Sequence, residues 1–320
     1  MKPYAFTFWQ NSGAKPAYLQ LADETLRRNL ANGFNHVHLD YESCLEWVPE
    51  RDALWEMSAP ATKGRSVTSE GRRWAIFTGM LRVALIYHHG GLWVDADTIA
   101  FPQISLLADV VIKSDLVATE YEDARIANSV IGGRAGSAFF KRYWRSILGM
   151  HADKRRAGDL TAKWGEYGDR LIGFLLMEGP DWNSFIIPFG MLIQFDTNEG
   201  RPIFAKAELF EKRVPVTALG MMFFNNAIPD DMRTKPVCEL LAENSVLSRA
   251  YSLGMDDSLA NSYLLLADSR QLWPFNRARR IRKAVEEKTR ILTQRDIFKQ
   301  KLSDRNQIIS KLRNRLSDVD

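Results

Sequence analysis

Two aspartates separated by one residue form the part of this sequence best suited to chemistry. Asp95 and Asp97 lie in the stretch GGLWVDADT, residues 90–98, after a double glycine and a short apolar run. If that run is a strand continuing through the aspartates, both carboxylates point to the same face, because alternate residues of a strand share a face. Neighbouring carboxylates repel each other, and a divalent cation removes the repulsion. Oxygen ligands favour hard cations, so the pair predicts a site for Mg²⁺ or Mn²⁺.

Such a cation keeps coordination positions open, and this indicates what else the site binds. Mg²⁺ typically retains waters and takes oxygens from substrate phosphates. A nucleoside diphosphate is therefore the natural further ligand, and the metal would stabilise it as a leaving group. The competing interpretation is that one aspartate caps a turn and the other is solvated. The helical pattern, double glycine and apolar run before the pair favour the metal site.

The elements that must position the aspartates follow an alternating pattern. We predict a strand at 4–9, a helix at 16–30 and a strand at 34–40, and this opening favours a mostly parallel sheet of the α/β class. A helix is predicted over about 70–88, with apolar residues on one stripe and glycines at its end. It leads into the strand before the aspartates. Open sheets of this kind bind ligands beyond the carboxyl ends of their strands.

The rest of the body is predicted from apolar runs and from helical periodicity. Strand-like runs occupy 109–113, 116–120 and 128–133, and helical patterns cover 136–148 and about 160–177. Further apolar strands or loops follow between residues 185 and 255, among them the run SRAYSLGM.

A small polar segment, residues 58–71, is predicted to be a loop. The arginines that flank it, Arg65, Arg72 and Arg73, could fold over a diphosphate as mobile lids do. The alternative is that they form a solvated basic surface, and the sequence leaves both interpretations open.

Two pairs of histidines are also candidates for chemistry. His36 and His38 alternate on a predicted strand without a carboxylate or cysteine at a useful spacing, so we expect hydrogen-bonded strand histidines and no metal site. His88 and His89 end the long helix, where they are expected to interact with its last carbonyls.

The bulk composition excludes several classes of protein. The chain has 320 residues, 46% hydrophobic and 26% charged, which is typical of a globular protein with a sizeable core. Its two cysteines form neither a metal-ligand spacing nor a disulfide framework, so a reducing compartment is expected. We find no signal peptide and no apolar run long enough to span a membrane, and we therefore expect a cytoplasmic location.

The C-terminal segment differs from the body in charge. Residues 277–320 contain 14 Lys and Arg against 6 Asp and Glu, a net charge of +8, and the rest of the chain carries −4. Starting from Ile281, eight of eleven positions at alternating steps of three and four are apolar, which predicts a long amphipathic helix. It could pack on the body, form a homodimer, or lie on the anionic inner face of the cytoplasmic membrane. We divide the chain into a body, 1–272, and a basic helical tail, 273–320.

The segment LRVALIYHHGGLWVDADT, residues 81–98, resembles the sugar-binding region of glycosyltransferases that carry a DXD motif. These include glycosyltransferase family 32 and the related capsular polysaccharide synthesis proteins. The family pattern reads here as Gly79-x-x-Arg82, Ile86-Tyr87, Gly90-Gly91, Trp93, Asp95 and Asp97. The opening FTFWQNSGAKPAYLQLADETLRRN, the run NSVIGG and the pair Gly179-Pro180 resemble other family landmarks. The resemblance covers roughly residues 4–200 and is strongest at 74–98.

The resemblance implies a GT-A-like fold, a Rossmann-type mixed sheet flanked by helices, and a role for each matching residue. Asp95 would approach the ribose, and the metal through water, while Asp97 would bind the metal directly. Arg82 would reach the hydroxyls of the donor sugar; the alternative is a solvated helix charge. Trp9 would lie beside the nucleotide base; the alternative is a core residue next to Phe8.

The sequence departs from the family at two places. The aspartate expected three residues before the arginine is Gly79 here, so one of two donor-sugar contacts on that helix face is missing. A third metal ligand in such folds often comes late in the chain, and the available candidates are Asp256, Asp257 and Asn261.

We therefore predict a metal-dependent glycosyltransferase, of the hexosyltransferase type, that uses a UDP- or GDP-sugar. The acceptor would be a saccharide or lipid-linked saccharide of a capsule, lipopolysaccharide or exopolysaccharide, and retention of configuration is implied by the resemblance alone. One alternative is a catalytically silent nucleotide-sugar-binding subunit, which Gly79 favours. Another is a membrane-surface scaffold of a polysaccharide assembly. No nucleic-acid partner is expected.

Overall fold

The computed structural model describes residues 1–10, 15–59, 69–123, 125–159, 161–162, 165–179, 182–195, 204–215, 217–224 and 228–255. The predicted tail at 273–320 and the candidate ligands Asp256, Asp257 and Asn261 lie outside these residues. Arg65 and most of the predicted loop at 58–71 lie outside them as well. What was predicted of these segments stays a prediction, including the boundary between body and tail.

A six-stranded sheet forms the centre of the body, with the strand order β2-β1-β3-β6-β5-β7. Its strands are β1 (Tyr4–Phe8), β2 (Asn35–Leu39), β3 (Gly91–Val94), β5 (Leu116–Glu120), β6 (Ile126–Gly133) and β7 (Ser184–Ile187). β1 runs parallel to β2 and β3, β5 runs parallel to β7, and β6 pairs antiparallel with β3 and β5. The predicted mixed α/β sheet is confirmed, and the carboxyl ends of β1, β2 and β3 share one edge.

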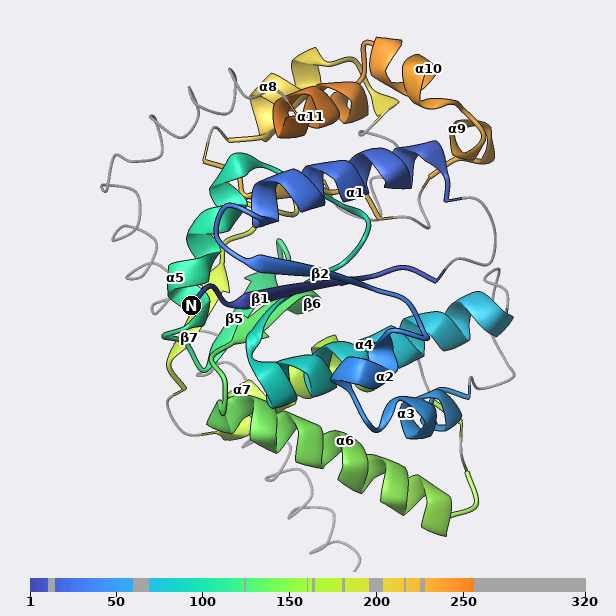
Figure 1. Cartoon of the computed structure of the whole chain (residues 1–320), viewed down its shortest axis with the longest axis vertical. Coiled ribbons are helices and arrows are strands. Elements are labelled where there is room, and N and C mark those ends of the chain that lie inside the picture. Colours follow the sequence, from blue (N-terminus) through green and yellow to red (C-terminus); the bar gives the residue numbers. More distant parts are fainter. Residues whose placement is uncertain are drawn as a thin grey trace, which may run out of the picture. The chain divides into compact units, whose positions relative to one another are not determined.

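Helices cover both faces of this sheet (Figure 1). One face carries α2 (Cys44–Trp47), α3 (Arg51–Met57), α4 (Ser69–His89), α6 (Ala138–Arg156) and α7 (Asp169–Glu178). The other face carries α1 (Ala17–Leu30), the 3₁₀ segment η1 (Pro102–Leu106) and α5 (Leu107–Val111). No helix in the described ranges is long and apolar enough to cross a membrane.

A smaller layer packs against α1. A two-stranded antiparallel ribbon joins β4 (Thr98–Ala100) to β8 (Gly220–Met222). The layer also contains four short helices, of which α8 (Glu208–Arg213) precedes β8, while α9 (Asp230–Arg233), α10 (Val237–Ala242) and α11 (Val246–Met255) follow it. α1 contacts β4, α10 and α11 directly, so it lies between the central sheet and this layer.

The alternation of side chains explains why β3 is apolar throughout. Trp93 pairs with Phe6 of β1 and Ile131 of β6, and these three side chains pack in the core on the α4 side. Leu92 and Val94 point to the opposite face and join the core on the α1 side. A strand that is covered on both faces reads as a continuous hydrophobic run.

Two segments predicted to be strands or loops are helical in the structure. Residues 109–113 were assigned to a strand, but Leu107–Val111 form α5, and SRAYSLGM belongs to α11. Apolar runs of this length do not distinguish a strand from a buried helix by periodicity alone. In α11 the spacing of Leu247, Ala250 and Tyr251 puts all three in one core cluster, as a helix face requires.

Candidate functional site

Asp95 and Asp97 lie in a turn between β3 and β4, beyond the carboxyl end of β3. The Thr98 N–H donates to the Asp95 carbonyl at 3.1 Å and closes the turn, while the Asp95 N–H donates to the carbonyl of Ser129 at 2.9 Å. The strand ends one residue before Asp95, so the expectation that a continuing strand directs both carboxylates to one face is wrong. The turn determines where each of them points.

Two buried donors hold the carboxylate of Asp95. The Trp93 indole Nε1–H donates to Oδ1 at 2.6 Å, and Nη2 of Arg82 lies 3.1 Å from the same oxygen. Nη1 of Arg82 makes a longer contact with Oδ2, at 3.5 Å. Trp93 is 1% exposed and Arg82 is 6% exposed, whereas the Asp95 side chain keeps 27% of its surface. The two short contacts therefore fall on one oxygen, and the other oxygen is less engaged.

Arg82 is itself held by two backbone carbonyls and by the ring of Trp93. Its Nε donates to the carbonyl of Thr78 at 3.0 Å, and its Nη1 donates to the carbonyl of Asn128 on β6. The guanidinium carbon lies 5.1 Å from the centre of the Trp93 ring. The interpretation of Arg82 as a solvated helix charge is wrong, because the side chain is buried and ion-paired. Its contact with donor-sugar hydroxyls stays a prediction.

The charge state of Asp95 depends on these neighbours. Burial raises the pKa of Asp95 above the ordinary value for aspartate, while the Arg82 charge and the hydrogen bonds from Trp93 and Arg82 act in the opposite direction. Removing the arginine would leave the effect of burial on this pKa without its main opposing charge.

Asp97 has different neighbours, which belong to the α1 layer. Its carbonyl accepts from the N–H of Phe223 at 3.1 Å. Burial is the main cause that raises the pKa of Tyr18 on α1; Arg233 opposes it and the Asp97 charge adds to it, so the carboxylate lies within electrostatic reach of that hydroxyl. Arg233 donates to the same hydroxyl at 3.2 Å. The two aspartates thus connect the turn to opposite layers of the body.

A cation at this turn would rely on few protein ligands. Within the described part of the chain, no group of three or more His, Cys, Asp and Glu side chains is placed to hold a metal ion. Asp95 and Asp97 could supply two carboxylates, and water or diphosphate oxygens would complete the shell, as is usual for Mg²⁺. The resemblance gives the direct metal contact to Asp97, and Oδ1 of Asp95 already accepts from two donors.

Trp9 follows β1 at the same edge of the sheet. Its N–H donates to the carbonyl of Leu39 at 2.9 Å, and Nζ of Lys15 lies 5.9 Å from the ring centre. The partly buried ring packs against the core cluster that α1 shares with the smaller layer. Phe8 faces the α4 side and contacts Phe77 and Trp74. Trp9 is thus a partly buried residue packed against a different core cluster from Phe8, and its place beside a nucleotide base stays a prediction.

Gly79 lies on α4 one turn before Arg82. The residue is buried, yet a Cβ built on it would meet no atom within 4 Å apart from adjacent residues and its own helix backbone. The position where the resemblance predicts an acid is thus open space, and no larger neighbouring side chain fills it.

Several residues around Asp95 have no role in the predictions from the sequence. Trp93 could have been found, because residues two apart on a strand share a face. Asn128 and Ser129 contribute backbone carbonyls from β6, a pairing that the local pattern does not reveal. Burial is the main cause of the raised pKa of Tyr121; the charges of Asp169 and Asp95 add to it, whereas Arg125 and Arg82 oppose it. This tyrosine therefore lies within electrostatic reach of two carboxylates.

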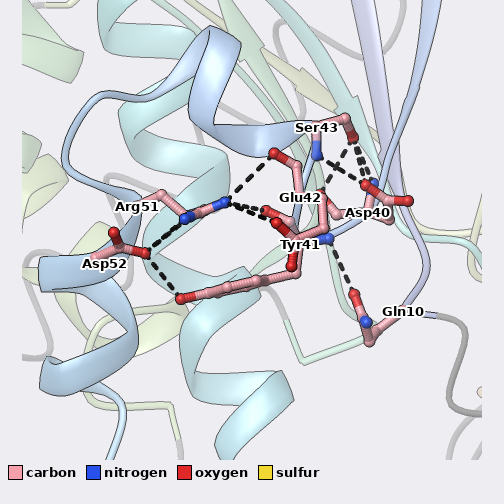
Figure 2. A network of polar contacts seen from close by, with 7 residues as sticks. All are labelled: Gln10, Asp40, Tyr41, Glu42, Ser43, Arg51 and Asp52. Atoms are coloured by element: carbon pink, nitrogen blue, oxygen red, sulfur yellow. Dashed lines mark hydrogen bonds and ion pairs between the residues drawn. The ribbon is translucent and has the colours of Figure 1, made fainter.

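A second polar network occupies the neighbouring carboxyl ends of β1 and β2 (Figure 2). The Tyr41 N–H donates to Oε1 of Gln10 at 2.9 Å, and the Tyr41 hydroxyl donates to Oδ1 of Asp52 at 3.0 Å. Arg51 contacts Asp52 at 2.9 Å, donates to the carbonyls of Tyr41 and Glu42, and lies over the Tyr41 ring at 4.4 Å. These contacts fasten the segment after β2 to the start of α3 and to the residue after Trp9.

Arg73 has a structural role that neither predicted alternative describes. Its Nη2 donates to the carbonyl of Trp55 at 2.9 Å, and its Nε lies 3.4 Å from Oγ of Ser58. The guanidinium carbon stacks 3.9 Å from the Trp55 ring centre. Arg73 therefore ties α4 to α3, and in this arrangement its guanidinium is engaged in these contacts and does not extend over a diphosphate.

The strand histidines are hydrogen-bonded, as predicted. The hydroxyl of Thr7 lies 3.0 Å from Nε2 of His36 and 3.1 Å from Nδ1 of His38. Asp23 of α1 also lies 3.5 Å from His38, a carboxylate partner that the sequence did not reveal. Burial is the main cause that lowers the pKa of His36 to about 4, and it also lowers the pKa of His38.

The histidines at the end of α4 differ from the expectation. His88 lies 3.1 Å from Glu50, and His89 lies 2.7 Å from the carbonyl of Trp47. They bind the α2–α3 segment, and the expected interaction with the last carbonyls of their own helix is not among the contacts found in the described residues.

The chain was compared with known families, curated proteins and solved structures. No family model and no curated protein sequence matches it. Among solved structures, the PaToxG glycosyltransferase matches with a TM-score of 0.35 and 13% identity, covering 56% of this chain and 69% of that one. A glycosyltransferase involved in the glycosylation of the major capsid of PBCV-1 matches with a TM-score of 0.37 and 11% identity, covering 71% and 96%. Scores this low identify neither a family nor an activity.

Proposed function

We propose that this chain is a metal-dependent glycosyltransferase that moves a sugar from a nucleoside-diphosphate sugar to a saccharide acceptor. The observation that carries the proposal is the turn after β3, where Asp95 and Asp97 lie beyond the carboxyl ends of parallel strands and buried donors fix Asp95. Open α/β sheets bind their ligands at this edge. The sequence resemblance of residues 81–98 to a sugar-binding region supports the same activity.

Each residue would contribute a separate part of donor binding. A bound Mn²⁺ or Mg²⁺ would stabilise negative charge on the departing diphosphate. Asp97 would hold that ion directly, and Asp95 would accept hydrogen bonds from a ribose hydroxyl or a metal-bound water. Trp9, at the end of β1, would lie against the nucleotide base. Arg82 would keep Asp95 ionised and oriented. Any contact with the sugar would come from guanidinium N–H groups that these contacts do not use.

The finer features of the reaction rest on the resemblance. We propose a UDP- or GDP-sugar as donor, a surface polysaccharide or lipid-linked saccharide as acceptor, and retention of configuration. The basic tail at 273–320 would bring the enzyme to an anionic membrane surface or join two copies.

A thermal-shift screen tests donor binding. UDP- and GDP-sugars are added with and without Mn²⁺, because a ligand that binds only the folded state raises the unfolding midpoint. We expect one nucleotide class to raise the midpoint of the wild-type protein only with metal. Asp97→Ala should abolish this shift, while Asp153→Ala, which removes an exposed carboxylate on α6, should leave it unchanged. If no UDP- or GDP-sugar shifts the midpoint with metal, the proposal fails.

A catalytically silent nucleotide-sugar-binding subunit is the second candidate, and Gly79 favours it. The open space at this position leaves α4 without the acid that the resemblance predicts beside Arg82. Such a protein would show the metal-dependent midpoint shift but would neither hydrolyse the nucleotide sugar nor transfer its sugar. Product analysis after incubation with donor and Mn²⁺ separates the two candidates.

A further inference from the structure

We propose that Trp93 is a positioning residue of this site, which acts with Arg82 to orient Asp95 so that Oδ2 alone is presented to the ligand. The ligand group would be a hydroxyl or a metal-bound water of a nucleoside-diphosphate complex. This inference rests on the proposed function and assigns different tasks to the two aspartates.

The sheet itself fixes the position of the indole donor. Trp93 is 1% exposed and is paired with Phe6 on one side and Ile131 on the other. Its ring therefore has little freedom, and Nε1–H meets Oδ1 of Asp95 at 2.6 Å, a short contact of the kind made to charged acceptors. An indole nitrogen only donates, so it cannot compete with the carboxylate for the ligand's own donors.

Arg82 completes the restraint on the same oxygen. Its side chain is anchored by the carbonyls of Thr78 and Asn128, and from this position Nη2 reaches Oδ1 at 3.1 Å. Oδ1 thus accepts from two donors that cannot move independently of α4 and the sheet. Oδ2 has the 3.5 Å contact with Nη1 and no shorter one within the described part of the chain.

The arrangement divides the work between the two aspartates. The positive charge of Arg82 largely offsets that of Asp95, so Asp95 adds an oriented hydrogen-bond acceptor and little net charge. Asp97, whose charge acts on Tyr18 of the other layer, would supply negative charge to the proposed cation. An Oδ2 that turned away from the ligand would lose this contact, and Trp93 and Arg82 prevent that rotation.

Replacing the indole tests the restraint in the intact protein. Trp93→Phe removes the N–H and keeps an aromatic ring, and Trp144→Phe makes the same change in the same core cluster, where Trp144 stacks on Tyr87. Calorimetry with Mn²⁺·UDP and Mn²⁺·GDP gives Kd, and circular dichroism shows that each variant is folded. Loss of one charge-assisted hydrogen bond to Asp95 predicts about tenfold weaker binding for Trp93→Phe. Trp144→Phe should bind as the wild type does.

A double-mutant cycle distinguishes positioning from general damage to the core. In an Asp95→Asn background, Trp93→Phe should weaken binding by less than about twofold, because effects that pass through one residue are not additive. In steady-state kinetics of sugar transfer, Trp93→Phe should raise KM for the donor, and its kcat should change much less. Equal effects of Trp93→Phe in both backgrounds would overturn the proposal.

A ligand-free measurement separates failure of this inference from failure of the proposed function. The indole N–H resonance of Trp93 is assigned by its absence from the spectrum of Trp93→Phe. It should shift in Asp95→Asn and stay in place in Asp97→Asn. If the indole N–H resonance does not shift in Asp95→Asn, the positioning role is overturned, whether or not the protein binds a nucleotide. If the resonance does shift in Asp95→Asn but the wild-type protein binds neither Mn²⁺·UDP nor Mn²⁺·GDP, the positioning role stands and the proposed function is refuted.

Discussion

Two arginine clusters lie at the same edge of the sheet, and their differences indicate which of them serves a ligand. Arg82 and Arg51 are both buried, at 6% and 8% exposed, and each lies over an aromatic ring. Arg51 collects partners from residues 41–52, a single stretch of chain (Figure 2). Arg82 joins α4 to β3 and β6, which are distant in sequence.

The acids of the two clusters differ even more. The side chains of Asp52 and Glu42 are 67% and 85% exposed, so water satisfies them without help from Arg51. Asp95 is mostly buried, which raises its pKa, and the Arg82 charge opposes that effect. A local cluster with solvated acids fastens a chain segment, whereas a long-range cluster that fixes one partly exposed carboxylate is suited to binding. The following predictions test this contrast.

Replacing each arginine in turn should give the largest difference between the two clusters, measured as the loss in free energy of unfolding. Arg82→Gln leaves the Asp95 carboxylate without its opposite charge in a mostly buried place, and we expect it to lower the free energy of unfolding by about 3 kcal/mol. Arg51→Gln should cost clearly less, because its acids are solvated. Urea denaturation at pH 7.5 measures both. Equal losses in the two variants would contradict the contrast.

The histidines on the α1 face predict an effect of pH that is separate from both arginine clusters. His36 has a folded-state pKa of about 4, below the ordinary value of 6.5, so the unfolded chain binds the proton more readily. Stability from its burial is complete above about pH 6.5 and is lost as the pH falls towards 4. Allowing for its partial exposure, we expect a loss of about 2 kcal/mol.

Denaturation curves at several pH values check this, and His36→Gln is the variant to compare. Its free energy of unfolding should vary less between pH 6.5 and 4 than that of the wild type. An unchanged slope would show that other groups cause the pH dependence.

Gly79 sharpens the comparison, because open space lies one turn before Arg82 in the cluster proposed to bind a ligand. Gly79→Ala should raise the free energy of unfolding by about 0.5–1 kcal/mol, since alanine favours a helix interior and meets no obstacle there. Gly149→Ala on α6, also with open space, should stabilise by a similar amount and leave sugar transfer unchanged. If the space beside Gly79 receives donor-sugar groups, only Gly79→Ala should alter KM for the donor.

The smallest effect is expected at Asp52. Asp52→Ala removes an exposed partner of Arg51 and Tyr41 while both carbonyl contacts of Arg51 stay in place. We expect no measurable change in nucleotide binding or transfer rate. A large loss of either would mean that the network of Figure 2 belongs to the binding site.

Several elements could be predicted because their signals are local. The helix before β3 was recognised from its apolar spacing and its terminal glycines, and the structure places α4 at Ser69–His89. α5 and α11 were misassigned because short apolar runs fit more than one structure. The clusters around Asp95 and Arg51 were not predicted, since periodicity does not report which buried polar groups meet.

The sequence by itself determined the α/β class, the helix–glycine–strand order and the position of Asp95 and Asp97 after β3. These follow from hydrophobic spacing and from glycine conformation, which act over a few residues. Only the tertiary structure decided that a turn separates the two carboxylates and that they meet opposite layers. It also brought the carbonyls of Asn128 and Ser129 to Arg82 and Asp95. The physical reason is that β6 pairs with β3 across more than thirty residues, and such pairing depends on the packing of the whole sheet.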